Sequence, residues 1–306
     1  LVSADAKSAP GAVRVFGPGA RLLNFVLGSS VRFQHLPVPF ELYSDGIDLP
    51  VFEEFGAGTA ALHLRDQLER NALLADTEYR RRFRKAFDRK KLGPSLWHRD
   101  FHDAVIVECP DAGLVGKSFG QIAEERGLHP LDAFLDVLVD NGERNVRWTT
   151  IVANHRPKQL DKLANEPVIH MGFSDAGAHL RNMAFYNFSL RLLKRVRDAE
   201  AAGRPFMSVQ RAVYRLTSEV ADWFGFEAGR LRQGDRADFV VIDPAGLTDA
   251  VDGYHEEKVP FYGDLSRMVN RNDDAVVATG VGGTVVFRGG QFCEGYGTTV
   301  KSGRYL

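Results

Sequence analysis

The chain has 306 residues, 44% of them hydrophobic and 26% charged, and its 39 basic and 40 acidic side chains leave a net charge of −1. This composition is typical of a soluble globular protein of about two domains, and the near-neutral balance argues against a general nucleic-acid-binding surface. No apolar run approaches the ~18 residues of a membrane span, and the first residues do not resemble a signal peptide. We therefore expect a cytoplasmic protein that contacts neither nucleic acid nor membrane.

The first predicted elements are a linker and a strand. Residues 3–11 are small and polar, as in the frayed edge of a linker, and the chain begins with Leu1 rather than Met. Residues 31–36 alternate between polar and apolar side chains, which predicts a strand, and Pro37 ends it.

A strongly charged helical region follows. Residues 62–91 have a helical composition, and Phe83 and Phe87 lie four residues apart on one predicted helix face. The arginines around them suit either a solvated helix face or a nucleic-acid contact, and we favour the solvated face.

Short apolar strands then alternate with helices between residues 101 and 220, which is the rhythm of a parallel sheet or barrel. Strands are predicted at residues 147–153 and 168–173. Ser118 opens a helix with a capping-box spacing, and apolar spacing predicts a helix over residues 209–224.

The tail changes to the period of two that is typical of strands. Residues 237–242 form one predicted strand, and residues 284–287 run into Gly289 and Gly290, as in a hairpin. The tail is therefore predicted to be a small β unit.

The strongest chemical signal is Asp175, which follows the predicted strand 168–173 in a run of small residues. The carboxyl ends of barrel strands carry active-site residues, and an aspartate there can bind a metal and accept a proton from its water. A serine and an aspartate before a glycine are also typical of a plain turn, which is the alternative interpretation.

Three segments in the same order resemble the amidohydrolase superfamily, and within it the D-aminoacylase-like group of N-acyl-D-amino-acid deacylases. They are residues 167–179, 212–221 and 229–244. The resemblance is clear over about residues 116–243, and it implies that these segments form barrel strand eight, the next helix and the return to a flanking β-sandwich.

The fold class implied is α/β: the C-terminal part of a TIM-like (β/α)8 barrel with a helical insertion and a small β-sandwich domain. Such a barrel needs about 250 residues, and only three barrel strands are predicted here. We expect residues 1–45 to form a barrel segment near strand six and residues 46–116 a mostly helical insertion. Residues 117–233 would form barrel strands seven and eight with their helices, and residues 234–306 part of the sandwich.

The resemblance also implies site residues. Asp175 matches the strand-eight aspartate that contacts the metal and shuttles the proton. His179 falls near the substrate position of relatives, although a loop histidine bonded to backbone fits equally. Arg181 could bind the substrate carboxylate through two hydrogen bonds, and His155 is placed to line the cleft or to serve a structural role.

The chain departs from the family because it contains no H-x-H, the family's first pair of metal ligands. His98 and His102 have a four-residue spacing that could imitate a helical metal pair, but they lack the glutamate of H-E-x-x-H. We therefore expect a separate or missing N-terminal segment of the same enzyme to supply the other ligands.

These observations predict a zinc-dependent hydrolase that deacylates N-acyl-D-amino acids, with a small molecule as substrate. Two alternatives stay open: hydrolysis of a cyclic amide or ureide, and a non-catalytic amidohydrolase-like scaffold. Assembly into a homo-oligomer is left open as well.

Overall fold

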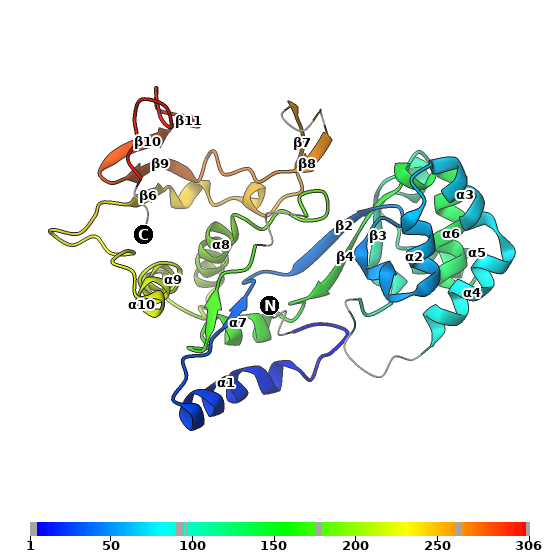
Figure 1. Cartoon of the computed structure of the whole chain (residues 1–306), viewed down its shortest axis with the longest axis horizontal. Helices are drawn as coiled ribbons and strands as arrows, with labels where there is room; N and C mark the ends of the chain where they lie inside the picture. The colour runs from blue at the N-terminus through cyan, green and yellow to red at the C-terminus, as the bar shows by residue number, and fades with distance from the viewer. Residues whose placement is uncertain are drawn as a thin grey trace.

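The computed structural model describes residues 5–89, 95, 97–174, 179–260, 263 and 265–303. Helices and strands are both abundant, which confirms the mixed α/β class. The described strands form four separate sheets, two of them with only two strands (Figure 1). None of these sheets closes into a barrel, so the expected barrel is not seen in the described part of the chain.

Two short strands pair in parallel at the centre of the chain's fold. β1 (Phe33–His35) lies beside β5 (Ile169–Met171), with His35 level with Met171. The sequence predicted both strands, but as barrel strands six and eight, which a seventh strand would separate. Their direct parallel pairing therefore differs from the expected strand order.

The strand expected as barrel strand seven belongs instead to an antiparallel sheet. β4 (Arg147–Ala153) lies between β2 (Phe40–Asp45) and β3 (Ala104–Glu108), and runs antiparallel to both. The backbone groups on both edges of β4 are therefore used by strands that the sequence analysis did not predict. This is why β4 does not join β1 and β5 in one parallel sheet.

Five α-helices pack into a lobe on one side of this antiparallel sheet (Figure 1). They are α2 (Gly56–His63), α3 (Gln67–Ala75), α4 (Thr77–Asp88), α5 (Phe119–Arg126) and α6 (Pro130–Asn141). Aromatic side chains fill the lobe, with the ring of Phe52 stacked on Phe134 at 5.4 Å between centroids. The predicted helical region over residues 62–91 is thus three helices, and α5 and α6 share their core.

The arginines of α4 divide between solvent and a neighbouring helix. Arg81 and Arg82 are exposed, and both contact Glu78. Arg80 and Arg84 instead form ion pairs with acidic side chains of α6. The charged run is thus a helix face shared by solvent and α6.

A second group of helices surrounds β1 and β5 and forms its own apolar core. It contains α1 (Val13–Leu27), α7 (Pro157–Ala164), α8 (Phe188–Ala201), α9 (Val209–Leu216) and α10 (Ser218–Phe224). The helix predicted over residues 209–224 is interrupted at Thr217. A Cβ on Gly229 would lie 2.7 Å from the Thr217 carbonyl carbon, so the backbone at Gly229 packs closely against this interruption.

The C-terminal part is mostly β structure. The order β11–β10–β9–β6 makes one antiparallel sheet, and β7 pairs with β8 in another. The bounds are β6 (Phe239–Ile242), β7 (Glu256–Val259), β8 (Leu265–Met268), β9 (Val276–Val281), β10 (Thr284–Arg288) and β11 (Gln291–Phe292). Gly289 and Gly290 have φ values of 57° and 83°, which confirms the predicted hairpin turn.

Short 3-10 turns complete the described elements: η1 (Pro50–Glu54), η2 (Phe101–Asp103), η3 (Ala112–Leu114), η4 (Glu143–Asn145), η5 (Pro244–Gly246) and η6 (Asp249–Val251). None of the described helices combines the length and the apolar character that crossing a bilayer demands.

The residues expected to be a frayed linker are partly fixed to the fold. Asp5 is fully buried and forms an ion pair with Arg156. Ala6 bridges to Ala153 at the end of β4, and the Lys7 N–H donates to the carbonyl of Val152 at 3.0 Å. The prediction of a free linker was therefore wrong for residues 5–7, because a charge partner lies 151 residues further along the chain.

Candidate functional site

The predicted catalytic residue, Asp175, lies outside the described residues, as do residues 176–178. The structure does describe the strand and the loop that lead to it. Gly172 donates its N–H to the carbonyl of His35 at 3.2 Å, one residue beyond the end of β5. The backbone three residues before Asp175 is therefore held against the end of β1.

The parallel register places the ends of β1 and β5 on one edge. Phe33 pairs with Ile169, and His35 with Met171, so both strands end at the same level. His35 is the last residue of β1, and its side chain is fully buried. An imidazole thus lies at the strand edge from which Asp175 follows.

His35 was not predicted from the sequence as a site residue. The signal that identifies it is its position at the carboxyl end of a predicted strand, which is the criterion that selected Asp175. That signal becomes informative only once the parallel pairing of β1 with β5 is known.

The end of β4 is tied to the same edge by Asn154. Its side-chain amide donates to the carbonyls of Leu36 at 3.0 Å and Val38 at 3.2 Å, directly after His35. Asn154 is fully buried and has a φ of 60°, a left-handed conformation that is uncommon outside glycine. A buried amide in this conformation holds the loop after β1 in place, and Arg195 of α8 donates to the Pro37 carbonyl at 2.6 Å.

Aromatic packing holds the segment before Asp175 from another side. The ring of Phe173 lies edge-on to Phe40 at 5.6 Å, and Phe40 packs in the same way on Phe185. Gly172 and Phe173, just after β5, are therefore held by a backbone hydrogen bond and by a ring contact, respectively.

A second histidine, His170, lies on the other face of β5. Burial lowers the pKa of His170 to about 4, and the guanidinium groups of Arg32 and Arg215 act in the same direction. Its ring packs edge-on against Trp223 at 5.1 Å. His170 is thus a neutral side chain at pH 7.

His155 has a different environment from the buried edge. It is exposed and borders a cavity of about 600 Å³ whose lining includes Arg156, Lys158 and Arg204. This surface is basic, and one of its cations, Arg156, is already paired with Asp5.

Arg181 is engaged in ion pairs with acidic side chains of the chain itself. Its guanidinium donates to both carboxylate oxygens of Asp45, at 2.6 and 2.8 Å, and to Glu256 at 2.6 Å. Arg147 joins the same network through Asp45 at 2.7 Å. The two-hydrogen-bond contact that was predicted for a substrate carboxylate is therefore made with the carboxylate of Asp45.

His179 begins the turn that leads back into the described chain. Its carbonyl accepts hydrogen bonds from the N–H groups of Asn182 and Met183, both at 2.8 Å. The side chain is half-buried.

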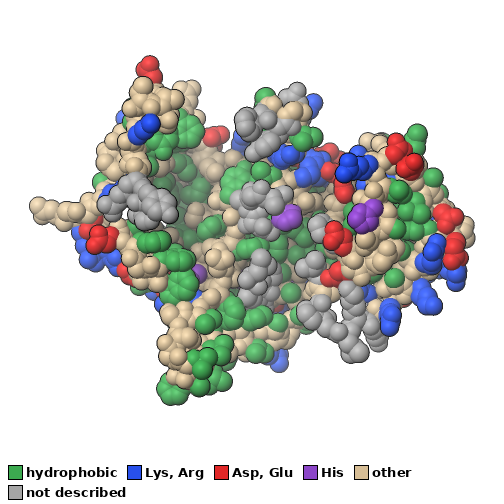
Figure 2. All heavy atoms as spheres, in the orientation of Figure 1, with side chains coloured by type: hydrophobic (Ala, Val, Ile, Leu, Met, Phe, Trp, Pro, Cys, Tyr) green, Lys and Arg blue, Asp and Glu red, His purple; other side chains and the backbone are tan. Residues whose placement is uncertain are grey.

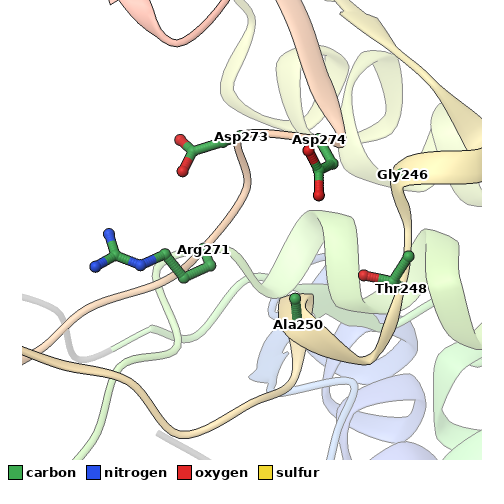
Figure 3. Close-up of a pocket in the computed structure, with 6 residues that line it drawn as sticks. All are labelled: Gly246, Thr248, Ala250, Arg271, Asp273 and Asp274. Carbon is green, nitrogen blue, oxygen red and sulfur yellow. The ribbon is translucent and has the colours of Figure 1, made fainter.

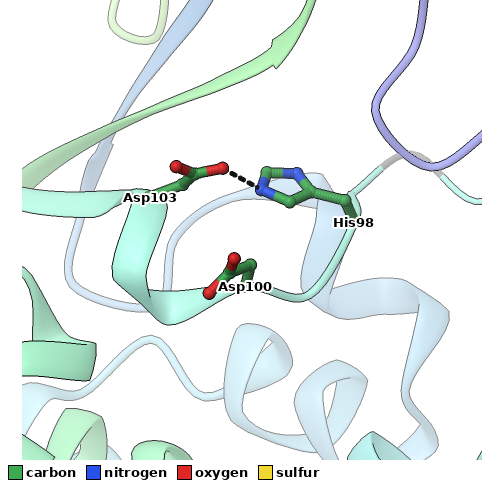
Figure 4. A group of neighbouring side chains, drawn as sticks. All are labelled: His98, Asp100 and Asp103. Atoms are coloured by element: carbon green, nitrogen blue, oxygen red, sulfur yellow. Dashed lines mark hydrogen bonds and ion pairs between the residues drawn. The ribbon is translucent and has the colours of Figure 1, made fainter. Parts of the chain in front are cut away.

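A possible metal-ligand group among the described residues is His98, Asp100 and Asp103 (Figure 4). His98 Nε2 lies 2.7 Å from Asp103 Oδ2, and the same oxygen is paired with Lys7. Asp100 accepts the N–H of His102 at 2.9 Å as the cap of η2. Burial lowers the pKa of His98, with Asp103 acting in the opposite direction. The ammonium of Lys7 already neutralises the carboxylate of Asp103, so this group is an ion network that fixes Lys7 to η2.

The predicted imitation of a metal pair is not formed. His102 projects to Glu124, with Nε2 at 3.7 Å from its carboxylate, while His98 faces Asp103. The two histidines therefore serve different ion pairs.

The C-terminal part carries a cavity of about 210 Å³, where Thr248 and Asp274 point inward and Arg271 and Asp273 point away (Figure 3). Arg271 is paired with Glu257. None of the residues predicted from sequence as catalytic or substrate-binding lines this cavity.

The chain is similar in sequence to uncharacterised proteins that are about twice its length. Uncharacterised proteins of Mycobacterium tuberculosis and Mycobacterium bovis are 80% identical over 310 residues, covering 100% of this chain and 51% of each relative. The chain thus spans about half the length of these relatives. No protein-family model matches it.

Two kinds of solved deacylase are similar in part. A D-aminoacylase with a binuclear metal centre gives a TM-score of 0.36 at 20% identity, over 62% of this chain and 36% of its own. The N-acyl-D-glutamate deacylase of Bordetella bronchiseptica, solved with zinc and a phosphonate inhibitor, gives 0.36 at 22% identity, over 63% and 37%. TM-scores of this size do not establish a common fold.

Proposed function

We propose that the chain is the Asp175-bearing part of a metal-dependent amide hydrolase that deacylates N-acyl-D-amino acids. The observation that carries the proposal is the end of β5, the strand that precedes Asp175 in the sequence. Gly172, one residue beyond β5, is bonded to His35 at the end of a parallel neighbour. Convergent strand ends of this kind are where α/β folds place their chemistry.

Asp175 is assigned the proton transfer. Its carboxylate accepts a proton from the attacking water and returns it to the leaving amine, as a general base and then a general acid. Zinc, when bound, polarises the amide carbonyl and lowers the pKa of a coordinated water toward ~7. His35 is a nitrogen donor at the same edge, which is a ligand type that zinc accepts.

The described residues at the β1–β5 edge do not supply the three protein ligands that a catalytic zinc site needs. Asp175 and His35 would supply two of these ligands. In the group His98, Asp100 and Asp103, the Asp103 carboxylate already forms ion pairs with Lys7 and His98. The remaining ligands are therefore assigned to a further polypeptide segment. The doubled length of the mycobacterial relatives supports such a segment.

Substrate contact is assigned to His179 and His155. His179 follows the Asp175 loop directly, and His155 follows Asn154 at the end of β4. Arg181 is assigned a structural role in the 179–183 turn instead of substrate binding, because its guanidinium donates to Asp45 and Glu256.

The non-catalytic scaffold is the second candidate. It is favoured by the small number of metal donors that the described residues place at the β1–β5 edge. The experiment is metal analysis and an activity assay on a polypeptide of the relatives' full length that contains this chain. The hydrolase account predicts about one or two zinc ions per polypeptide and hydrolysis of N-acyl-D-amino acids but not of the L isomers. Absence of both bound metal and hydrolysis favours the scaffold, and turnover of cyclic ureides alone would change the substrate class.

A further inference from the structure

Helix α1 exposes an apolar face of a kind that proteins usually cover. Val13, Gly17 and Ala20 are buried against the second core, while the opposite side chains face solvent. The exposed apolar residues are Val15, Leu22, Leu23, Phe25, Val26 and Leu27. Phe25 is 88% exposed, which is unusual for a phenylalanine in a folded chain.

The apolar surface continues from α1 to α10. Trp223 donates its indole N–H to the carbonyl of Ser30 at 2.9 Å, which joins the end of α10 to the loop after α1. Phe224 and Phe226, stacked at 5.6 Å, are also exposed beside this junction. Hydrophobic side chains gather over α1 and over the α9–α10 region on the same side of the molecule (Figure 2).

In the described residues, the parallel sheet consists of β1 and β5 alone, and neither pairs with a third strand. Parallel sheets are normally covered on both faces, and a helix or loop often covers their edge strands. Among the described residues, the exposed helix face and the two-stranded parallel sheet therefore both lack covering structure.

The charge of α1 indicates which kind of partner could bind its exposed face. The helix contains no acidic side chain, and of its two arginines Arg21 is paired with Glu166. So few free charges give little to attract an ionic partner or an anionic lipid surface, for which clustered cations are needed. An apolar protein surface is the complement that fits.

The size of the relatives identifies the occupant. This chain matches 51% of their length at 80% identity, so each carries about as many residues again outside the matched region. We propose that the α1–α10 face, defined by Leu22, Phe25, Val26 and Phe224, is the docking surface for that additional segment. The inference rests on the segment invoked in the proposed function, but it does not depend on the reaction.

The test is cysteine accessibility in a polypeptide of the relatives' full length that contains this chain. Phe25→Cys is compared with Leu68→Cys on α3, a matched control whose parent side chain is 80% exposed. Maleimide labelling at each position is read by peptide mass spectrometry, with the denatured protein as the reference rate.

The docking surface predicts that Cys at position 25 is labelled at least about tenfold more slowly than Cys at position 68, at every protein concentration. Equal labelling overturns the proposal. Protection that disappears on dilution would identify a second copy as the occupant, and protection that requires lipid vesicles would identify a membrane; either result also overturns it. Because labelling does not report turnover, an inactive polypeptide with a protected position 25 would refute the reaction and keep the docking surface.

Discussion

The N–H of Gly172 donates to the carbonyl of His35 at 3.2 Å, and this bond joins the ends of two strands that lie more than a hundred residues apart in sequence. It places the start of the Asp175 loop beside a buried imidazole. The proposed chemistry depends on this relationship, because neither side chain alone indicates a site.

The buried ion pair between Arg70 and Glu143 should be the most sensitive charged contact of the helical lobe. Arg70 Nη1 lies 3.1 Å from Glu143 Oε1, both side chains are buried, and the same oxygen accepts the N–H of Ile47 at 3.0 Å. Glu143→Ala leaves the guanidinium buried without its charge partner, so we expect a loss of about 3–5 kcal/mol in the free energy of unfolding. Urea denaturation measures this loss.

Glu78→Ala is the matched control, because Glu78 and Arg81 form an exposed pair on α4. Its cost should be far smaller than that of Glu143→Ala, because solvent screens an exposed ion pair. Equal effects of the two substitutions would contradict the assignment of the Arg70–Glu143 pair as a buried anchor.

The Glu256 network should give the chain an acid-dependent stability. Burial acts to raise the pKa of Glu256, but hydrogen bonds from Ser266, Tyr254 and Arg181 lower it to about 2. An unfolded glutamate has a pKa of about 4.3, so the network stabilises the fold above that pH and its contribution is lost as the pH falls toward 2.

Glu256→Gln removes this contribution. Above about pH 4.3, the free energy of unfolding of the variant should be lower than that of the wild type by about 1 kcal/mol, after allowance for partial exposure. The two values should converge as the pH falls toward 2. Urea unfolding over this pH range measures the difference. A difference that stays constant with pH would show that Glu256 does not titrate in this way.

The capping box of α5 offers a local test of the fold. The Ser118 hydroxyl accepts the N–H of Gln121 at 3.1 Å, and the Gln121 side chain accepts the N–H of Ser118 at 2.9 Å. Ser118→Ala should lower the free energy of unfolding by about 1 kcal/mol, whereas Ser118→Thr keeps the cap and most of the stability. If thermal melting finds the two variants equally destabilised, the hydroxyl is not the stabilising group.

Features that depend on a few neighbouring residues could be predicted from the sequence. The Ser118 cap, the Gly289–Gly290 hairpin and the strand ending at His35 all follow from local spacing and turn chemistry. Contacts between distant residues could not be predicted. Arg70 and Glu143 are 73 residues apart, and Asp5 and Arg156 are 151 apart, so nothing local marks either pair.

The sheet topology could not be predicted from the sequence for a related reason. The period-two pattern identifies a strand but not its neighbours, so Arg147–Ala153 was assigned to a parallel sheet although it pairs antiparallel with Phe40–Asp45. For the site, the Asp175 loop could be proposed from its small residues and preceding strand. The role of His35 required the register with Met171, which the linear pattern does not contain.

The ion network at His98 should not hold the metal. Asp103 is paired with both His98 and Lys7, so a cation would have to displace the lysine. His98→Ala in the full-length polypeptide should leave the zinc content unchanged, as measured by plasma mass spectrometry. Loss of zinc from this variant would move the metal site to the helical lobe.

The most direct measurement is the turnover of an N-acyl-D-amino acid by Asp175→Asn in the full-length polypeptide, beside Asp140→Asn, an exposed carboxylate of α6. The amide keeps the size of the side chain but cannot accept the proton, so the rate should fall by at least about 10²–10⁴. The melting temperature should be unchanged, and Asp140→Asn should retain full activity. Undiminished turnover by Asp175→Asn would contradict the account.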